Sequence, residues 1–420
     1  MLALLRRRNV ALLWLAGLVS MLGDWLLLIA LPFFVYDLTG SALASGATFM
    51  ASTLPRVFLS SVAGVFVDRW DRQRTLVLSD LLRGVLLLPL LLVRSTDTLW
   101  IVYIVAMLQA SIAQFFVPAQ RALLPHIVTE RELLPANALL SLTENLTRLL
   151  GPVIGGVLYS TSGLASVVAL DVGSFLLSGA LLTLIVAGAT VSTRAAGVAA
   201  GTTKLRDAWL VGLRLVGHNR LLTRIFTIAG LAMIGEGLFV ALIVPFTRVV
   251  LGGDATQLGW LMSAQALGGI VGGIVLGRVG ALLPPLRLIA IAGIIVGTLL
   301  LIIVNSGNLI VSLVLIALAG LPLVGFFVSL QTLLQQHTAD GYRGRVFGAF
   351  GTVTALLTVV GMGLAGLLAD RIGTVPTLSL AGVAYALAGA VALLTTPTPA
   401  AAPRPATEHI NIPVTVQGDA

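Results

Sequence analysis

Five acidic residues lie within or beside long apolar runs, and they set the chemistry that this sequence offers. They are Asp24, Asp80, Glu144, Asp171 and Glu236. A charged side chain at the centre of a bilayer costs about 2.5 to 3.5 kcal/mol even on the mild insertion scale. Each of these carboxyl groups therefore needs a cationic partner, a water-filled cavity or a proton. Reversible protonation and the binding of a cationic group are the two kinds of chemistry they predict.

Asp24 and Glu236 are the deepest of the five acids. Asp24 follows the start of its apolar run by about 15 residues and Glu236 by about 14, or roughly 21 to 22 Å of helix. Our first hypothesis is that Asp24 is the main protonation site, and that Glu236 assists it or contacts a cationic part of a substrate. The alternative hypothesis is a neutral carboxyl group bonded to the backbone of a neighbouring helix.

Basic residues accompany some of these acids. Glu144 and Arg148 are four residues apart, so a helix places them on one face, where they can neutralise each other. A structural pair is the favoured interpretation, and contact with substrate is the alternative. Arg56 lies in one apolar run and Asp80 and Arg83 in the next, and we expect a buried ionic cluster from them. The sequence assigns no role to the remaining acid.

Composition places the chain in a lipid bilayer. Hydrophobic residues make up 58% of it and charged residues 10%, whereas soluble domains carry about 25% charged residues. There is no cysteine and the four histidines are scattered, so we expect no metal site and no cofactor. The net charge of +8 comes from scattered basic residues, which indicates membrane topology rather than nucleic-acid binding. Lys204 is the single lysine and no Gly-Lys pair exists, which excludes a phosphate-binding ATPase loop.

Twelve apolar segments are long enough to cross roughly 30 Å of hydrocarbon as helices, so the expected fold class is an all-α integral membrane protein. The segments lie near 10–36, 42–66, 75–93, 98–118, 135–159, 164–188, 222–247, 256–277, 285–304, 308–333, 345–369 and 375–395. The expected domains are a cytoplasmic N-terminus (1–9), a six-helix bundle (10–188), a cytoplasmic linker with an amphipathic helix (189–221), a second six-helix bundle (222–395) and a disordered cytoplasmic tail (396–420).

The distribution of basic residues predicts the orientation of these segments. Of the 25 lysines and arginines, 19 lie in segments on the side of the N-terminus. Three lie in the opposite loops, namely Arg94, Arg248 and Arg371. Cytoplasmic loops carry the excess of positive charge in membrane proteins. We therefore expect both termini in the cytoplasm.

An internal repeat divides the chain into two halves. Met21-Leu22-Gly23-Asp24 reappears as Met233-Ile234-Gly235-Glu236, 212 residues later. Gly151, Gly156 and Gly163 match Gly361, Gly366 and Gly373 at an offset of 210. Six segments separate each residue from its counterpart, so the halves have the same orientation in the membrane. Two similar bundles facing a central cavity can expose it to each side in turn, which predicts a transporter.

One loop carries a resemblance to a known family. The segment Gly64-Val65-Phe66-Val67-Asp68-Arg69-Trp70-Asp71-Arg72-Gln73-Arg74 resembles the signature loop of the major facilitator superfamily, Gly-x-x-x-Asp-Arg-x-Gly-Arg-Arg. It departs from the pattern at Asp71, where the family usually has glycine, and at Gln73. Together with Leu38-Thr39-Gly40-Ser41 and Ala136-Asn137-Ala138, the change at Asp71 is similar to the bacterial efflux branch that includes macrolide exporters and the enterobactin exporter.

The resemblance implies two further groups of site residues. The first is a conformational latch on the cytoplasmic side, formed by Gly64, Asp68, Arg69, Arg72, Arg343 and Arg345, with Asp68 against the start of the eleventh span. Simple anchoring of this loop in the headgroup region is the alternative. The second is an antiporter-like segment of the fifth span, Gly151, Pro152, Gly155 and Gly156. It can bend the helix because proline removes a backbone hydrogen bond.

The leading functional prediction is a secondary active transporter and not an enzyme. We expect proton-coupled efflux of small amphipathic or hydrophobic compounds, such as drugs or a siderophore, by alternating access. An importer or a lipid translocator on the same fold is one alternative. A membrane-embedded enzyme is the other, in which Asp68 and Asp71 would mimic the metal-binding acidic motif of prenyl transferases. The expected partners are a small-molecule substrate, protons and lipid, and the expected form is a monomer in a bacterial inner membrane.

Overall fold

The computed structural model describes residues 2–67, 69–186 and 213–395, without the side chains of residues 2–3, 60–65, 279 and 281. Within these ranges every regular element is a helix, as the sequence predicts. The first half contains α1 (Arg8–Thr39), α2 (Ala42–Val67), α3 (Arg72–Leu87), α4 (Trp100–Leu123) and α5 (Leu133–Thr183). The second half contains α7 (Arg220–Pro245), α8 (Ala255–Val279), α9 (Pro285–Ser306), α10 (Leu309–Gln336), α11 (Arg343–Ile372) and α12 (Thr374–Thr395).

Short helical turns connect or extend these long helices. The 3-10 turns are η1 (Leu2–Arg6), η2 (Leu88–Leu92), η3 (Thr96–Thr98), η4 (Leu124–His126), η5 (Glu130–Glu132), η7 (Gly280–Leu282) and η8 (Asp340–Tyr342), and η6 (Phe246–Val250) is a π-turn. Several long helices begin at a capping side chain. Asn219 and Asn308 each accept hydrogen bonds from two backbone N–H groups of the following turn. Such caps satisfy donors that have no partner within the helix.

Ten described segments are long and apolar enough to cross a membrane. One of them, Glu130–Thr183, has 54 residues, and it contains a break at Gly163, where φ is 73° and ψ is −178°. Dividing α5 at this break gives the fifth and sixth helices of the first half. The 26-residue helix α2 lies outside the ten. The ten spans are therefore confirmed, and the count of twelve stays a prediction that depends on α2 and on the two parts of α5.

The backbone repeats between the two halves. Gly163 and Gly373, which the sequence pairs at an offset of 210, both have positive φ, 73° and 87°. Each ends one long helix and lets the next run back, and an L-residue in this region of φ is strained. Gly40 and Gly252 form a second such pair, 212 residues apart, each with φ of 63°. The repeat seen in the sequence is thus present in the turns that connect the helices.

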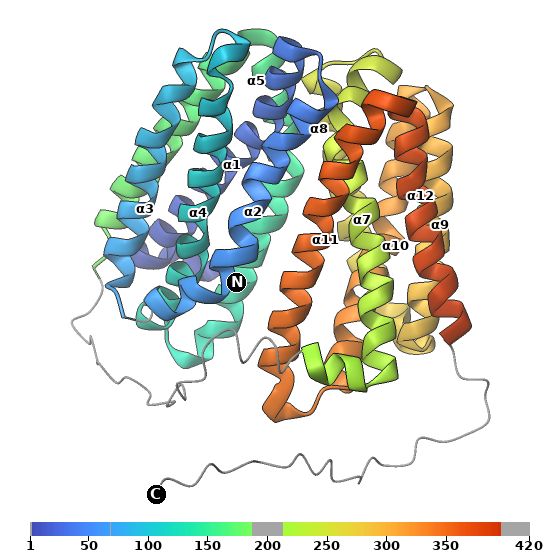
Figure 1. Ribbon diagram of the computed structural model, residues 1–420. Coiled ribbons are helices and arrows are strands. Elements are labelled where there is room, and N and C mark those ends of the chain that lie inside the picture. Colours follow the sequence, from blue (N-terminus) through green and yellow to red (C-terminus); the bar gives the residue numbers. More distant parts are fainter. Residues whose placement is uncertain (1, 68, 187–212, 396–420) are drawn as a thin grey trace, which may run out of the picture.

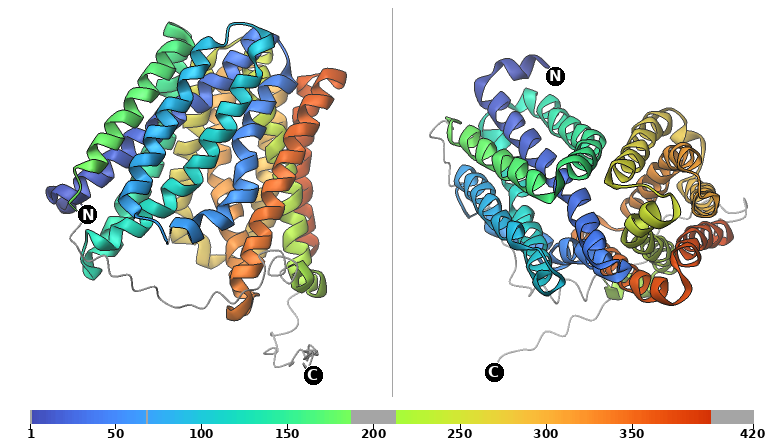
Figure 2. Two further views of the ribbon diagram at one scale, coloured as in Figure 1. Left: turned by 60° about the vertical axis from the view of Figure 1, so that its left-hand side comes forward. Right: turned by 90° about the horizontal axis from the view of Figure 1, so that it is seen from above.

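The two halves form two bundles side by side. Helices α1 to α5 lie on one side in Figure 1 and α7 to α12 on the other, and the view from above in Figure 2 shows the same division. The main packing between the bundles joins α5 to α8 and α2 to α11. The predicted linker lies outside the described residues up to 212, and a short helical turn covers 213–218. The predicted tail, 396–420, also lies outside them, so the domain limits stay predictions.

The bundles touch through two contacts that the repeat relates to each other. Gly156 of α5 lies against the start of α8, where a Cβ on the glycine would come within 2.9 Å of the carbonyl carbon of Ala255. Gly366 of α11 lies against the start of α2, where a Cβ would come within 2.7 Å of Leu43 Cα. The glycines are 210 residues apart and their partners 212, so one contact is made twice. Both lie toward the upper end of the bundles in Figure 1.

Polar groups join the bundles at the same end. Arg248 of η6 forms an ion pair with Asp37 at the end of α1, with 3.1 Å between Nη2 and Oδ1. The hydroxyl of Tyr159 on α5 donates to the other oxygen of Asp37 at 3.1 Å. At the opposite end of α11, Gly344, Gly348 and Gly351 face open space where a Cβ would stand. The described contacts therefore close the bundles at the end that the topology prediction places outside the cell.

Candidate functional site

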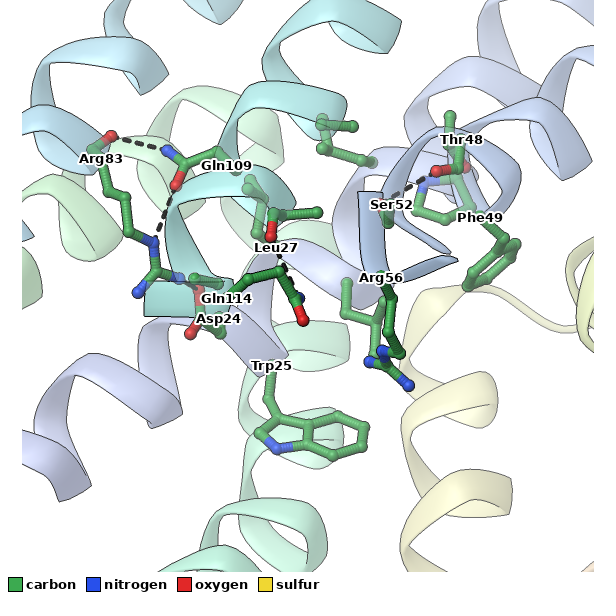
Figure 3. A pocket seen from close by; sticks show the side chains of 16 residues that line it. Asp24, Trp25, Leu27, Thr48, Phe49, Ser52, Arg56, Arg83, Gln109 and Gln114 are labelled. Carbon is green, nitrogen blue, oxygen red and sulfur yellow. Dashed lines mark hydrogen bonds and ion pairs between the residues drawn. The ribbon is translucent and has the colours of Figure 1, made fainter. Parts of the chain in front are cut away.

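An ion pair between α1 and α3 lies at the centre of the first bundle. Arg83 of α3 is 3% exposed, and its Nη2 donates to Oδ1 of Asp24 on α1. Its Nε donates to Oε1 of Gln109 on α4 at 3.1 Å, and the guanidinium lies 4.3 Å from the ring centre of Phe175. Figure 3 shows Arg83, Gln109 and Asp24 together. Burial between four helices fixes the guanidinium in place and directs its free edge to Asp24.

A second carboxylate, Asp80, lies one turn before Arg83 on α3. It is fully buried, and its Oδ1 is 3.8 Å from Arg83 Nη1. Ser20 of α1 donates to one oxygen at 3.1 Å, and Ser178 of α5 donates to the other at 2.5 Å. The predicted ionic cluster of Asp80 and Arg83 therefore exists. Arg56 does not belong to it, because Arg56 is exposed and forms no ion pair with a described residue.

Asp24 also lines a cavity of about 210 Å³ within the first bundle. Its walls come from α1 to α4 and combine apolar side chains, such as Leu28 and Phe49, with the polar groups of Arg56 and Gln114. The side chain of Asp24 is 41% exposed, although Arg83 holds one of its oxygens. This cavity can therefore accept an apolar molecule and present one carboxylate to it.

Glu236 occupies the position in the second bundle that Asp24 occupies in the first. The hydroxyl of Tyr385 on α12 donates to Oε2 of Glu236 at 2.7 Å, and Tyr385 is 1% exposed. Arg148 of α5 acts on Glu236 electrostatically from the other bundle. The two repeat-related acids thus have different partners, a guanidinium for Asp24 and a phenol for Glu236.

The predicted pairing of Glu144 with Arg148 is wrong. Glu144 pairs instead with Arg121 at the end of α4, with 3.4 Å between Oε1 and Nη2, and both side chains are at least half exposed. The spacing of four residues places Glu144 and Arg148 on one face, but a neighbouring helix offers the closer cation. Arg148 lines a second cavity of about 570 Å³ between α5, α8 and α10, whose other walls are mostly apolar.

Comparison with known proteins identifies the family. The sequence model of the Major Facilitator Superfamily matches residues 13–356 and, in a second alignment, residues 225–417. The chain belongs to the major facilitator superfamily. The second alignment starts near the beginning of α7, in agreement with the internal repeat. The sequence-based assignment to this superfamily of transporters is confirmed.

Relatives with curated descriptions include efflux proteins of the predicted branch. The transporter is 29% identical over 404 residues to the multidrug efflux pump Tap of Mycolicibacterium fortuitum, covering 92% of this chain and 96% of that protein. It is 25% identical over 365 residues to macrolide efflux protein A of Streptococcus pyogenes, covering 86% and 89%.

Solved structures share the fold. A bacterial homologue of the iron transporter ferroportin in the inward-facing state superposes with a TM-score of 0.70 at 16% identity, covering 92% of this chain and 98% of that one. A structure of a bacterial ferroportin homologue in the outward-facing state gives a TM-score of 0.55 at 17% identity with the same coverage. The arrangement of helices in this transporter is thus nearer to the inward-facing structure.

The predicted latch of this superfamily member is only partly within the described residues. Asp68 lies outside them, and Gly64 falls in α2 without a described environment. Arg69 is exposed and Arg72 begins α3. In the eleventh span, Arg343 pairs with Asp340 at 2.9 Å and Arg345 lies over the ring of Tyr342. The latch stays a prediction.

The departure of the signature loop at Asp71 has a local explanation. The side chain of Asp71 caps α3, since its Oδ1 accepts the backbone N–H of Arg74 at 2.7 Å. A glycine at this position would leave that donor without a side-chain partner. Asp71 therefore stabilises the start of the helix that carries Asp80 and Arg83.

The antiporter-like segment of the transporter lies between α1 and α8. A Cβ on Gly155 would come within 2.7 Å of Leu26 Cα, and one on Gly151 would meet the side chain of Trp25. Pro152 carries the carbonyl group against which Gly259 of α8 packs. Helical dihedral angles continue through Pro152, and Gly163 is the one residue of α5 outside the helical region. The glycines thus permit close approach of helices, and the predicted bend is at most milder than the break at Gly163.

Proposed function

We propose that this protein exports small amphipathic or hydrophobic compounds by alternating access and couples export to protons. The observation that carries the proposal is the cavity beside Asp24, in which apolar walls surround a partly exposed carboxylate. Such a site accommodates compounds with an apolar body and a cationic group, since the charge orients the molecule and the walls tolerate different shapes. The efflux relatives support the direction of transport.

The closed end of the bundles supports alternating access. The repeat-related contacts of Gly156 and Gly366 join the bundles at one end, together with the ion pair of Asp37 and Arg248. We propose that this is the inward-facing state and that the bundles, residues 10–188 and 222–395, separate at this end to release substrate outside. The latch of Asp68 with Arg69, Arg72, Arg343 and Arg345 would then form at the cytoplasmic end.

Proton coupling belongs to the same proposal. Asp24 and Glu236 remain the sequence-based candidates for exchange of a proton or contact with a cationic substrate, and their repeat-related depth supports this role. Glu144 and Arg148 are the secondary candidates. The further parts are a monomer in the bacterial inner membrane, both termini in the cytoplasm, and no enzymatic activity. Asp71, on which the enzyme alternative depended, serves as a helix cap, which argues against that alternative.

A lipid translocator is the second candidate function, because one observation favours it. The cavity between α5, α8 and α10 has apolar walls around the single cation of Arg148. An anionic headgroup could pair with that cation while its acyl chains follow the apolar wall.

The test of export uses an efflux-deficient bacterial host. Cells that express the wild-type protein should resist a subset of cationic amphipathic compounds in a growth-inhibition panel, and cells that express Asp24→Asn should lose that resistance at equal protein level. Everted vesicles should accumulate the same compounds when the interior is acidic. Resistance that Asp24→Asn retains in full would remove Asp24 from the mechanism, and accumulation that ignores the pH gradient would refute proton coupling. Transport of fluorescent phospholipid without any drug phenotype would favour the lipid translocator.

A further inference from the structure

Three carboxyl groups share one guanidinium in the first bundle. Asp24 comes from α1, Asp80 from α3 and Asp171 from the second part of α5, and each interacts electrostatically with Arg83. The fourth neighbour, Gln109 of α4, is neutral. If every carboxyl group were ionised, this buried cluster would carry a net charge of −2. A buried ion without a partner costs several kcal/mol, so part of the charge must be neutralised by a proton.

The environments of the three acids differ in a way that locates the proton. Asp24 bonds directly to Arg83 and is 41% exposed to the cavity. Asp80 accepts two serine hydroxyls and lies 3.8 Å from Arg83. Asp171 is fully buried and accepts only Ser174, at 3.1 Å to Oδ1. Its Oδ2 has no hydrogen-bond partner among the described residues. Asp171 is therefore the member whose charge is least compensated.

The fold brings Asp171 to this place through a close approach of α1. A Cβ added to Gly23 would coincide with Oδ1 of Asp171 and collide with the hydroxyl of Ser174. Only glycine at position 23 leaves room for the carboxyl group beside the helix that carries Asp24. The arrangement places a buried acid one residue along α1 from the cavity acid, with Arg83 close enough to act on both.

We propose that Asp171 carries the transported proton and that Arg83 links it to substrate binding at Asp24. The inference rests on the proposed function, namely export of cationic amphipathic compounds in exchange for protons. In the structure, Arg83 neutralises Asp24 and a proton neutralises Asp171. A cationic substrate that binds Asp24 takes the place of Arg83, which turns to Asp171. The O–H bond of Asp171 then breaks, the proton leaves to water, and Arg83 keeps its own protons and pairs with the new carboxylate.

This assignment separates the proton from the substrate. The sequence-based hypothesis gives the proton to Asp24, where proton and cation would compete for one carboxylate. Here they bind different carboxyl groups and compete for Arg83. Both schemes couple binding to proton release, and by linkage protons weaken substrate binding as much as substrate weakens proton binding. They differ in which variant abolishes the coupling and leaves binding intact.

The experiment measures cation binding and proton release on the full-length protein in lipid nanodiscs, with tetraphenylphosphonium as the cation. In wild type, each bound cation should release close to one proton in weak buffer. The dissociation constant should fall by up to about tenfold per pH unit across the titration range. Asp171→Asn preserves shape and should bind the cation without releasing protons and without pH dependence. Asp24→Asn should lose binding. Asp97→Asn, an exposed loop acid, should behave as wild type.

Three outcomes would overturn the inference. The first is proton release by Asp171→Asn at the wild-type level. The second is an Asp24→Asn variant that still binds the cation but no longer releases protons, since this assigns the proton to Asp24. The third is a wild-type protein that does not bind the cation. Should Asp171→Asn fail to fold, Gly23→Ala supplies the second variant, because its methyl group displaces the carboxyl group. It should reduce proton release by at least half, and wild-type release would reject the proposal.

Failure of this inference and failure of the proposed function give different results. If wild-type everted vesicles take up the cation with a pH gradient and Asp171→Asn does so equally, only the role of Asp171 falls. If the wild type shows uptake that no pH gradient changes, proton coupling falls and this inference falls with it. In the expected case, Asp171→Asn vesicles exchange labelled for unlabelled cation but do not accumulate it against a gradient.

Discussion

Removal of the carboxylate of Asp37 should open the end at which the bundles are closed. Asp37 accepts an ion pair from Arg248 of the second bundle at 3.1 Å and a hydrogen bond from Tyr159 at 3.1 Å. Asp37→Asn keeps an oxygen for Tyr159 but loses the ion pair. Since the two charged side chains are 33% and 45% exposed, water screens the pair, and such pairs contribute about 0.2 to 1 kcal/mol. A loss of about 1 kcal/mol shifts the ratio of the two states about fivefold.

The absence of cysteine makes the measurement direct. Cysteines introduced at Thr161 on α5 and Ser306 on α9 can carry spin labels on the two bundles, both exposed at the closed end. In Asp37→Asn, the distance distribution from pulsed electron paramagnetic resonance should gain a longer-distance population relative to the parent double-cysteine protein. Glu132→Gln is the matched control, because it removes an ion pair of similar type that joins Arg7 and Glu132 within one bundle.

Two results would refute this reasoning. One is a distribution in Asp37→Asn that does not differ from that of Glu132→Gln. The other comes from a double-mutant cycle with Arg248→Gln, in which the second substitution should add little once Asp37 is changed. Fully additive shifts would mean that the two residues act independently and that their ion pair does not hold the bundles together.

Three further predictions follow from close contacts in the fold. Gly156→Ala places a methyl group on the backbone of α8 and should disfavour the closed end by about 1 to 3 kcal/mol, measured by the same label distances, and an unchanged distribution would contradict the contact. Tyr385→Phe leaves the oxygen of Glu236 without its donor and should lower the free energy of unfolding by about 1 to 3 kcal/mol in detergent, whereas an unchanged melting temperature would show the hydrogen bond to be dispensable. Gly163→Ala forces alanine to φ of 73° and should cost about 1 to 2 kcal/mol, whereas Gly173→Ala, with helical backbone and open space, should not destabilise.

Much of the fold follows from sequence patterns that are local or periodic. Apolar runs of membrane-spanning length predict the helices, because backbone groups in lipid must be satisfied within the segment. The repeat predicts the paired turns, since Gly163 and Gly373 need the same unusual backbone conformation. The acids Asp24 and Glu236 also stand out, because an ionisable group within an apolar run has few structural explanations.

Side-chain pairing between helices could not be predicted in the same way. Spacing along one helix tells which residues share a face, but not which neighbouring helix that face meets. For this reason Glu144 pairs with Arg121 rather than with Arg148, and Arg83 rather than Arg56 becomes the partner of Asp24. The buried place of Asp171 depends on the approach of α1 at Gly23, which requires the packed structure. A glycine directly before an intramembrane acid was the available signal for this approach.

The repeat-related contacts at Gly156 and Gly366 bear on how quickly the protein can turn over. Each joins backbone to backbone, with no side chain of the glycine inserted into the partner helix. Separation of the bundles there breaks dispersion contacts worth about 0.1 to 0.2 kcal/mol per atom pair, without a rotamer change or a buried hydrogen bond to rupture at the glycines. A gate of this kind has a low activation barrier, so the rate of the transport cycle should be limited by the rearrangement of the charged groups and not by the separation of the helices.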